Sequence, residues 1–268
     1  LHQQEKLYYL KYFLSVSLFI VLTNNIVFHE DANKDRDLRV SIIQPNMKPT
    51  FKYGENNINE IKKVIHEMSK HSKDSDIIIY PETVIPELYD DKEDFFEKIS
   101  SQSKKILISG IFRRDTHTNR IFNSMLVIEK QSSIYDKRKL VPFGEFTPFP
   151  QLLLPIARML NIPMSNLSKG DSNSSEIILD EFIVHPLICY ESAYSNLINQ
   201  KDLSKPEVIV ILSNDSWFGE SLAPYQHMQI SQTRAVEFNK YILRSANTGI
   251  SAVIDNHGNI KKKIELNQ

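Results

Sequence analysis

Cysteine is almost absent from this chain, because Cys189 is the only one among its 268 residues. A single cysteine excludes a disulfide within the chain, so Cys189 is either a small buried hydrophobe or a nucleophile. The eight histidines show neither an HxxxH pattern nor a Cys–His spacing typical of metal ligands. The sequence therefore predicts no metal site.

The chain also lacks a large excess of positive or negative charge, and it contains little glycine. The net charge is −1, which argues against nucleic acid as the main partner. The chain has only seven glycines, beside many lysines, isoleucines and asparagines, a bias that we attribute to genomic base composition. Hydrophobic residues make up 41% and charged residues 24%, which is typical of a globular protein with a substantial core.

The N-terminal segment contains an uncharged stretch, YFLSVSLFIVLTNNIVF, over residues 12–28. Lys6 and Lys11 precede it and no small-x-small cleavage motif follows. We therefore predict a partial transmembrane segment over residues 1–28, with a signal anchor or a buried helix as alternatives. Residues 29–38 are predicted to form a polar linker. Because the chain begins with Leu1 rather than methionine, we expect an upstream portion to be missing.

From residue 39 onward, the hydrophobic pattern alternates between strands and helices. We predict strands over residues 39–44, 76–80, 105–112, 121–128, 182–189, 208–212, 241–245, 250–255 and 260–264, and helices over 55–72, 95–103 and 225–239. Residues 147–175, which contain four prolines, are predicted to be irregular. This alternation predicts an α/β domain in which helices cover a sheet or a pair of sheets.

Three segments carry side chains suited to acyl transfer. YPETVIP places Glu82 directly after a predicted strand, YDKRKLVPFGEF places Lys137 and Glu145 around a Pro-Phe-Gly turn, and ICYES places Cys189 at another strand end. A thiol attacks a carbonyl as the thiolate, so it requires a base or a positive environment. A carboxylate can act as the base and a lysine can stabilise the oxyanion. A predicted helix over residues 191–199 would direct its N-terminal N–H groups toward the sulfur.

Each of these residues alone has an ordinary structural explanation. A lone buried cysteine is usually structural, a Pro-Glu pair after a strand is usually a turn, and a lone lysine is usually solvated. No histidine is an evident partner of the cysteine, since His185 precedes it on the same strand. The combination of the three segments nevertheless favours a catalytic site.

These segments resemble the Glu-Lys-Cys triad of the nitrilase superfamily, the carbon–nitrogen hydrolases, and within it they are most similar to the bacterial apolipoprotein N-acyltransferases. The similarity rests on YPETVIP, VPFGEFTPF, ICYES, SIIQPN and the block that begins with SNDSWFG, and it extends over residues 39–255. It implies a nitrilase-like α-β-β-α sandwich over residues 39–268, preceded by a membrane helix. It also implies that the final strand region continues beyond Gln268.

The resemblance further implies roles for four residues. Cys189 would be the nucleophile that receives an acyl chain from a phospholipid, Glu82 the general base, and Lys137 the residue that stabilises the oxyanion. Glu145 would be a second essential glutamate that supports the lysine. The thioester would then acylate the α-amine of a lipid-modified N-terminal cysteine of a lipoprotein, in ping-pong chemistry that requires no cofactor.

Supporting roles are implied for Tyr190 and Glu191, which flank the nucleophile, and for Tyr53, an aromatic residue where the family often has a tryptophan. Trp217 is expected either to pack in the core or to line the wall of the site. Asn214 and Asp215 are interpreted as turn formers. Gln226 and His227, on a predicted helix, are interpreted as packing residues.

The expected partners are a phospholipid acyl donor, a lipoprotein acceptor and the membrane. The resemblance implies a monomer in the bacterial inner membrane, with its catalytic domain on the periplasmic side. Two other functions remain open. An amidase of the same fold would resolve the thioester with water, and a truncated, inactive protein would only be tethered to the membrane.

Overall fold

The computed structural model describes residues 2–24, 38–48, 57–89, 95–151, 166–171, 176–198, 207–219 and 221–268. It divides the chain into two units, Leu1–Asp37 and Leu38–Gln268, and each is described by itself. The catalytic domain predicted over residues 39–268 falls within the second unit.

The described residues of the first unit form helix α1 (His2–Asn24). Among the described residues, no helix is long and apolar enough to cross a membrane, so the prediction of a transmembrane helix is not supported. The physical reason is that Glu5, Lys6 and Lys11 occupy the first half of α1, and only eleven uncharged residues separate Lys11 from Thr23. A bilayer requires roughly 20 apolar residues. The predicted linker lies outside the described residues, apart from Leu38.

The second unit is built on two six-stranded mixed sheets. The first has the order β1-β2-β4-β5-β6, with β3 paired to β4; the second has the order β12-β11-β10-β9-β8-β7. The strands of the first sheet are β1 (Val40–Ile42), β2 (Ile77–Ile79), β3 (Leu88–Tyr89), β4 (Ile106–Arg114), β5 (Ile121–Ile128) and β6 (Ser132–Asp136). Those of the second are β7 (Ile177–Ile178), β8 (Ile183–Ile188), β9 (Glu207–Ser213), β10 (Tyr241–Ala246), β11 (Ser251–Ile254) and β12 (Ile260–Ile264).

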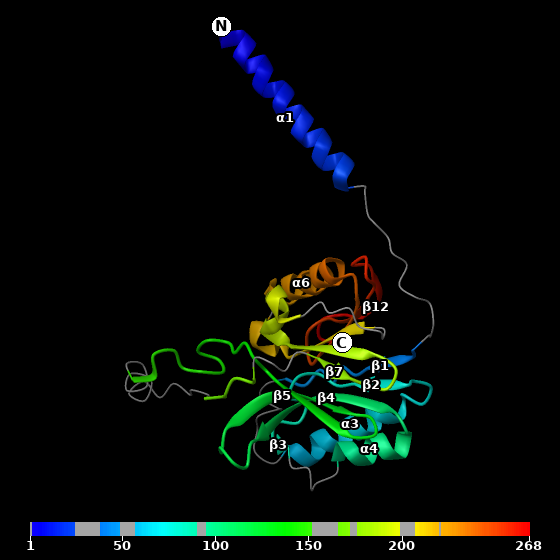
Figure 1. Cartoon of the computed structure of the whole chain (residues 1–268). Coiled ribbons are helices and arrows are strands. Elements are labelled where there is room, and N and C mark those ends of the chain that lie inside the picture. The colour runs from blue at the N-terminus through cyan, green and yellow to red at the C-terminus, as the bar shows by residue number, and fades with distance from the viewer. Residues whose placement is uncertain are drawn as a thin grey trace. The chain divides into compact units, whose positions relative to one another are not determined.

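In the described part of this unit, helices cover the outer faces of the two sheets (Figure 1). They are α3 (Ile58–Lys70), α4 (Phe95–Ser103) and α6 (Ala223–Phe238), with short 3-10 turns η1 (Cys189–Ala193), η2 (Ser195–Leu197) and η3 (Asp215–Phe218). One hydrophobic cluster joins α3 and α4 to the first sheet, a second lies between the sheets, and a third joins α6 to the second sheet. The predicted α-β-β-α sandwich is therefore confirmed.

Strand β2 shows why this sequence forms the inner layers. Ile78 contributes to the cluster under α3, whereas Ile77 and Ile79 contribute to the cluster between the sheets. Because successive side chains of a strand point to opposite faces, an uninterrupted apolar run fits a sheet that is covered on both sides. In both sheets the central strands run parallel, β1 with β2 and β4, and β8 with β9 and β10. The candidate site lies at the carboxyl ends of these parallel strands.

Candidate active site

Glu82 lies in the turn that follows β2, and its side chain is buried. The turn passes so close to β4 that a Cβ atom on Gly110 would lie 2.5 Å from the Cα atom of Glu82. Only a glycine fits at such a close backbone approach. Because Gly110 has no side chain, β4 leaves room for the backbone of Glu82.

Lys137 and two carboxylates form one buried cluster. The Nζ atom of Lys137 lies 2.8 Å from Oε1 of Glu145 and 3.3 Å from Oε1 of Glu82, and the lysine side chain is only 1% exposed. The Nδ2 amide of Asn123, on β5, donates to both of these carboxylate oxygens, at 2.8 Å to Glu82 and 2.9 Å to Glu145. The structure thus brings together the predicted residues Glu82, Lys137 and Glu145.

Burial by itself lowers the pKa of Lys137, but Glu82, Cys189 and Glu145 outweigh it and raise the pKa above its ordinary value. Lys137 therefore remains an ammonium ion, so it supplies a positive charge and does not act as a base. The backbone N–H of Val141 binds the other oxygen of Glu145, at 2.8 Å, which fixes that carboxylate against the lysine.

Cys189 follows β8 directly and adopts a left-handed backbone conformation, with φ of 51°. A non-glycine residue in this region costs roughly 1 kcal/mol, so surrounding contacts must hold the turn. Burial and the nearby carboxylate of Glu82 raise the pKa of the Cys189 thiol to about 12, although Lys137 acts in the opposite direction. The thiol is therefore protonated at neutral pH and needs a base when it reacts.

Glu191 joins the turn of the cysteine to the loop of the lysine. Its carboxylate accepts from the backbone N–H groups of Ile188 at 2.9 Å, Arg138 at 2.6 Å and Lys139 at 3.0 Å, and from the hydroxyl of Tyr135 at 3.0 Å. Burial raises the pKa of Glu191, and these hydrogen bonds partly offset that effect. The helix predicted over residues 191–199 is wrong, because the chain forms the short turns η1 and η2 and η1 contains this inward-pointing carboxylate.

We expect Glu191→Ala to destabilise the protein by at least about 3 kcal/mol, because buried N–H groups that lose their acceptor each cost about 1–3 kcal/mol. Glu191→Gln, which keeps one oxygen acceptor, should lose less. Urea unfolding of the two variants checks the order. An alanine variant as stable as the starting protein would show that the carboxylate does not hold the two segments together.

A second buried network contacts the backbone of Cys189, and it was not predicted from the sequence. His227, on α6, places Nδ1 3.0 Å from Oδ1 of Asp215 and Nε2 3.1 Å from the carbonyl oxygen of Cys189. Arg244, on β10, donates from Nη2 to Oδ2 of Asp215 at 2.9 Å, and both side chains are fully buried. Burial alone would raise the pKa of Asp215, but Arg244 and His227 hold it well below its ordinary range.

Comparison with known proteins places this site in a family. The model of the carbon–nitrogen hydrolases matches residues 39–268, which covers both sheets and every residue of the candidate site described above. The chain belongs to the carbon–nitrogen hydrolase family.

Curated relatives of this carbon–nitrogen hydrolase include apolipoprotein N-acyltransferases. That of Photobacterium profundum is 34% identical over 241 residues, and that of Pasteurella multocida 31% over 239 residues. In both cases the match covers 85% of this chain but only 46% of the relative, so the chain spans about half the length of these proteins.

Solved structures show the same fold at low identity. A CN-hydrolase superfamily protein from Xanthomonas campestris, which carries an arsenic adduct in its active site, has a TM-score of 0.65 at 18% identity; the match covers 87% of this chain and 88% of that one. A Saccharomyces cerevisiae member of branch 10 of the nitrilase superfamily has a TM-score of 0.62 at 16% identity, covering 85% and 86%.

Among the described residues, one group could present a metal with three ligands: Cys189, Asp215 and His227, whose ligand atoms lie within 4.8 Å of one another. The donor set suits zinc. However, Arg244 forms an ion pair with Asp215 and places Nη2 3.1 Å from Nδ1 of His227. A cation there would face a fixed guanidinium charge, so the cluster fits an internal hydrogen-bond network better than a metal centre.

The supporting residues differ in their placement. Tyr190 is partly exposed and its ring packs edge-on against Tyr194, whose hydroxyl donates to that of Tyr190 at 2.7 Å. Trp217 is 69% exposed, which rules out the core role considered for it. Its neighbour Phe218 lies edge-on to His227, with ring centroids 6.4 Å apart. Tyr53 lies outside the described residues.

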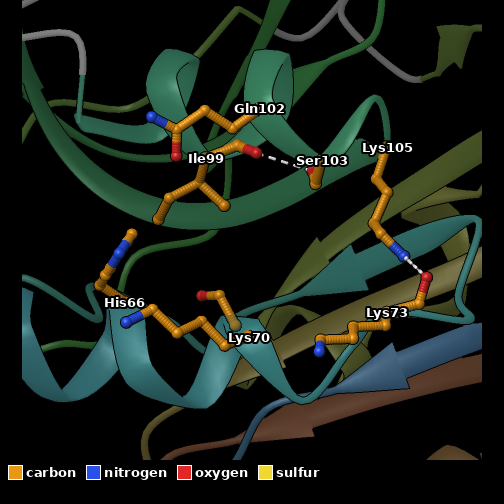
Figure 2. A pocket seen from close by; sticks show the side chains of 8 residues that line it. His66, Lys70, Lys73, Ile99, Gln102, Ser103 and Lys105 are labelled. Atoms are coloured by element: carbon orange, nitrogen blue, oxygen red, sulfur yellow. Dashed lines mark hydrogen bonds between the residues drawn. The ribbon is translucent and has the colours of Figure 1, made fainter.

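A separate cavity of about 320 Å³ lies between α3 and α4 and is lined by none of the predicted site residues (Figure 2). Two of the lysines that line it have partners. Lys70 forms an ion pair with Glu67 at 2.7 Å, and Lys105 donates to the backbone carbonyl of Lys73 at 2.7 Å. The cavity therefore belongs to the outer helical layer and not to the site.

Proposed function

We propose that this carbon–nitrogen hydrolase transfers an acyl chain from a phospholipid, through a thioester on Cys189, to the α-amine of a lipid-modified N-terminal cysteine of a lipoprotein. The proposal is supported by the hydrogen-bonded pair of Glu82 and Lys137 and by the influence of both charges on the pKa of the partly buried Cys189 thiol. The names of the curated relatives support the choice of substrates.

In the first half-reaction, Glu82 accepts the thiol proton while the sulfur attacks the ester carbonyl of the phospholipid. Lys137 stabilises the negative charge that develops on the carbonyl oxygen. When the tetrahedral intermediate collapses, the ester bond breaks and the departing alkoxide takes the proton from Glu82. A lysophospholipid leaves and the acyl chain remains on Cys189 as a thioester.

In the second half-reaction, the α-amine of the acceptor attacks the thioester and gives its proton to Glu82. The C–S bond breaks, and the proton returns to the sulfur as the amide is released. Lys137 remains charged throughout, because the carboxylate of Glu145 stays paired with it. A thioester is less stable than an amide, so the transfer requires no nucleotide.

The proposal assigns subsidiary roles to residues near the thiol. The backbone N–H of Tyr190 would be a second donor to the oxyanion, and the exposed ring of Trp217 would line the approach to the site. Tyr53 would contact lipid. We also propose a monomer at the bacterial inner membrane with the domain on the periplasmic side.

Intact-protein mass spectrometry tests the first half-reaction. The full chain is incubated with phospholipid in detergent beside Cys189→Ala, and we expect an added acyl mass that hydroxylamine removes and that the variant lacks. A folded sample whose thiol reacts with iodoacetamide but gains no acyl mass would contradict the proposal. Hydrolysis of small amides by the same sample would instead indicate an amidase.

A further inference from the structure

We propose that His227 is a positioning residue for the nucleophile: it donates from Nε2–H to the carbonyl oxygen of Cys189 and holds the turn that carries the sulfur. Nε2 lies 3.1 Å from this carbonyl and 3.0 Å from the hydroxyl of Ser192, which itself donates to the same carbonyl at 3.0 Å. The importance of this turn for catalysis rests on the proposed function, whereas its geometry does not.

The position of the proton on Nε2 follows from hydrogen-bond chemistry. A backbone carbonyl only accepts, so a bare Nε2 would place two lone pairs 3.1 Å apart in a buried site. With a proton on Nε2, the carbonyl of Cys189 receives hydrogen bonds from both His227 and Ser192. If Nδ1 also carries a proton, the ring is an imidazolium that donates to Asp215 at 3.0 Å. If it does not, Nδ1 accepts from Arg244 at 3.1 Å and its lone pair faces the carboxylate of Asp215.

The network fixes the imidazole ring with respect to three elements. His227 belongs to α6, Asp215 to η3 after β9, and Arg244 to β10, and the guanidinium of Arg244 also donates from Nε to the carbonyl of Ile250 at 3.1 Å. A Cβ atom on Gly249 would lie 2.2 Å from Oδ2 of Asp215, so the backbone also closes around the carboxylate. The ring is therefore a rigid donor for the turn.

The hydrogen bond from His227 to the carbonyl of Cys189 determines the position of the sulfur. Cys189 is partly buried at this left-handed turn, and its thiol is within the electrostatic influence of Glu82, Lys137 and Asp215. If the donor to its carbonyl is lost, the turn can relax toward an ordinary backbone conformation. The thiol would then leave the carboxylate and enter a more solvated environment, where it reacts as an ordinary cysteine.

Two neutral substitutions separate this role from general packing. His227→Gln places an amide N–H2 at about the position of Nε2, so it can still donate to Cys189. His227→Asn places its amide near the position of Nδ1, so it keeps a partner in Asp215 but does not reach the carbonyl. Both variants remove the imidazole, and circular dichroism and thermal unfolding establish that each sample is folded.

The readout is the rate at which iodoacetamide alkylates Cys189 across a range of alkaline pH, which requires no acyl substrate. We expect His227→Gln to follow the starting protein and His227→Asn to react at least about tenfold faster, since one unit of thiol pKa changes the thiolate fraction about tenfold. Equal rates for both variants would overturn the proposal. Failure of phospholipid to acylate the thiol would contradict the proposed function alone.

Ser192→Ala keeps the proposal testable if His227→Asn does not fold. It removes the second donor to the carbonyl of Cys189 but leaves the ring of His227 in place. We expect its alkylation rate to change by less than about threefold, which corresponds to about half a pKa unit of the thiol. A change of tenfold or more would show that Ser192, and not His227, holds the turn.

Discussion

Glu82→Gln is expected to change two properties of Cys189 in opposite directions. Acylation by phospholipid should fall about 10²–10⁴-fold, the usual contribution of a general base. Alkylation by iodoacetamide below pH 9 should become faster, because the carboxylate of Glu82 raises the pKa of the thiol and Lys137 lowers it. Glutamine keeps an oxygen that can accept from Asn123, so the fold should be retained.

The sign follows from the ionisation of the thiol. With a pKa of about 12, the thiolate fraction of Cys189 rises about tenfold per pH unit through the neutral and mildly alkaline range. Removal of the negative charge shifts the profile to lower pH, so the variant contains more thiolate at any given pH. Glu87→Gln is the control, since that carboxylate pairs with Lys62 instead. A loss of both activities in Glu82→Gln would contradict this electrostatic account.

Lys137→Met is expected to abolish acylation and also to destabilise the fold. Loss of one oxyanion donor typically lowers the rate about 10²–10³-fold. The lysine is 1% exposed, and its removal leaves the carboxylates of Glu82 and Glu145, which both accept from Asn123, without its positive charge. Removing one partner of a buried ion pair costs about 3–5 kcal/mol. Single-turnover acylation and urea unfolding measure the two effects.

The double variant Lys137→Met/Glu145→Gln separates these effects. It removes one of the two uncompensated carboxylates, so it should recover part of the free energy of unfolding without recovering acylation. Recovery of acylation would show that the ammonium group is not needed at the reacting carbonyl. A Lys137→Met variant with unchanged stability would show that Glu82 and Glu145 are not charged together in the folded protein.

The sequence predicted most of the sandwich because its inner strands are covered on both faces. Apolar runs such as Ile77–Ile79 and the strand Ile121–Ile128 have no other stable location, and the helix over Phe95–Ser103 has the predicted ends. Strand β6 (Ser132–Asp136) was missed because it lies at a sheet edge, where polar side chains face solvent and leave no apolar pattern.

The candidate site could be predicted only where its residues follow strands in specific motifs. Asn123 was missed, since a single asparagine within an apolar strand gives no indication that it will meet two distant carboxylates. Asp215 and His227 were interpreted as turn and packing residues, because their contact with each other and with Arg244 joins three separate segments. Local patterns report periodicity and turns, but not which buried polar groups will pair across the core.

The second half-reaction provides the most direct test of the proposed function. Acylated Cys189 is isolated and mixed with a diacylglyceryl-cysteine peptide that has a free α-amine, beside the same peptide with its amine acetylated. We expect the free peptide to gain the acyl chain as an amide while the thiol is regenerated, and the acetylated peptide to gain nothing. Release of free fatty acid at the same rate with either peptide would show that water resolves the thioester, and would contradict the acyltransferase account.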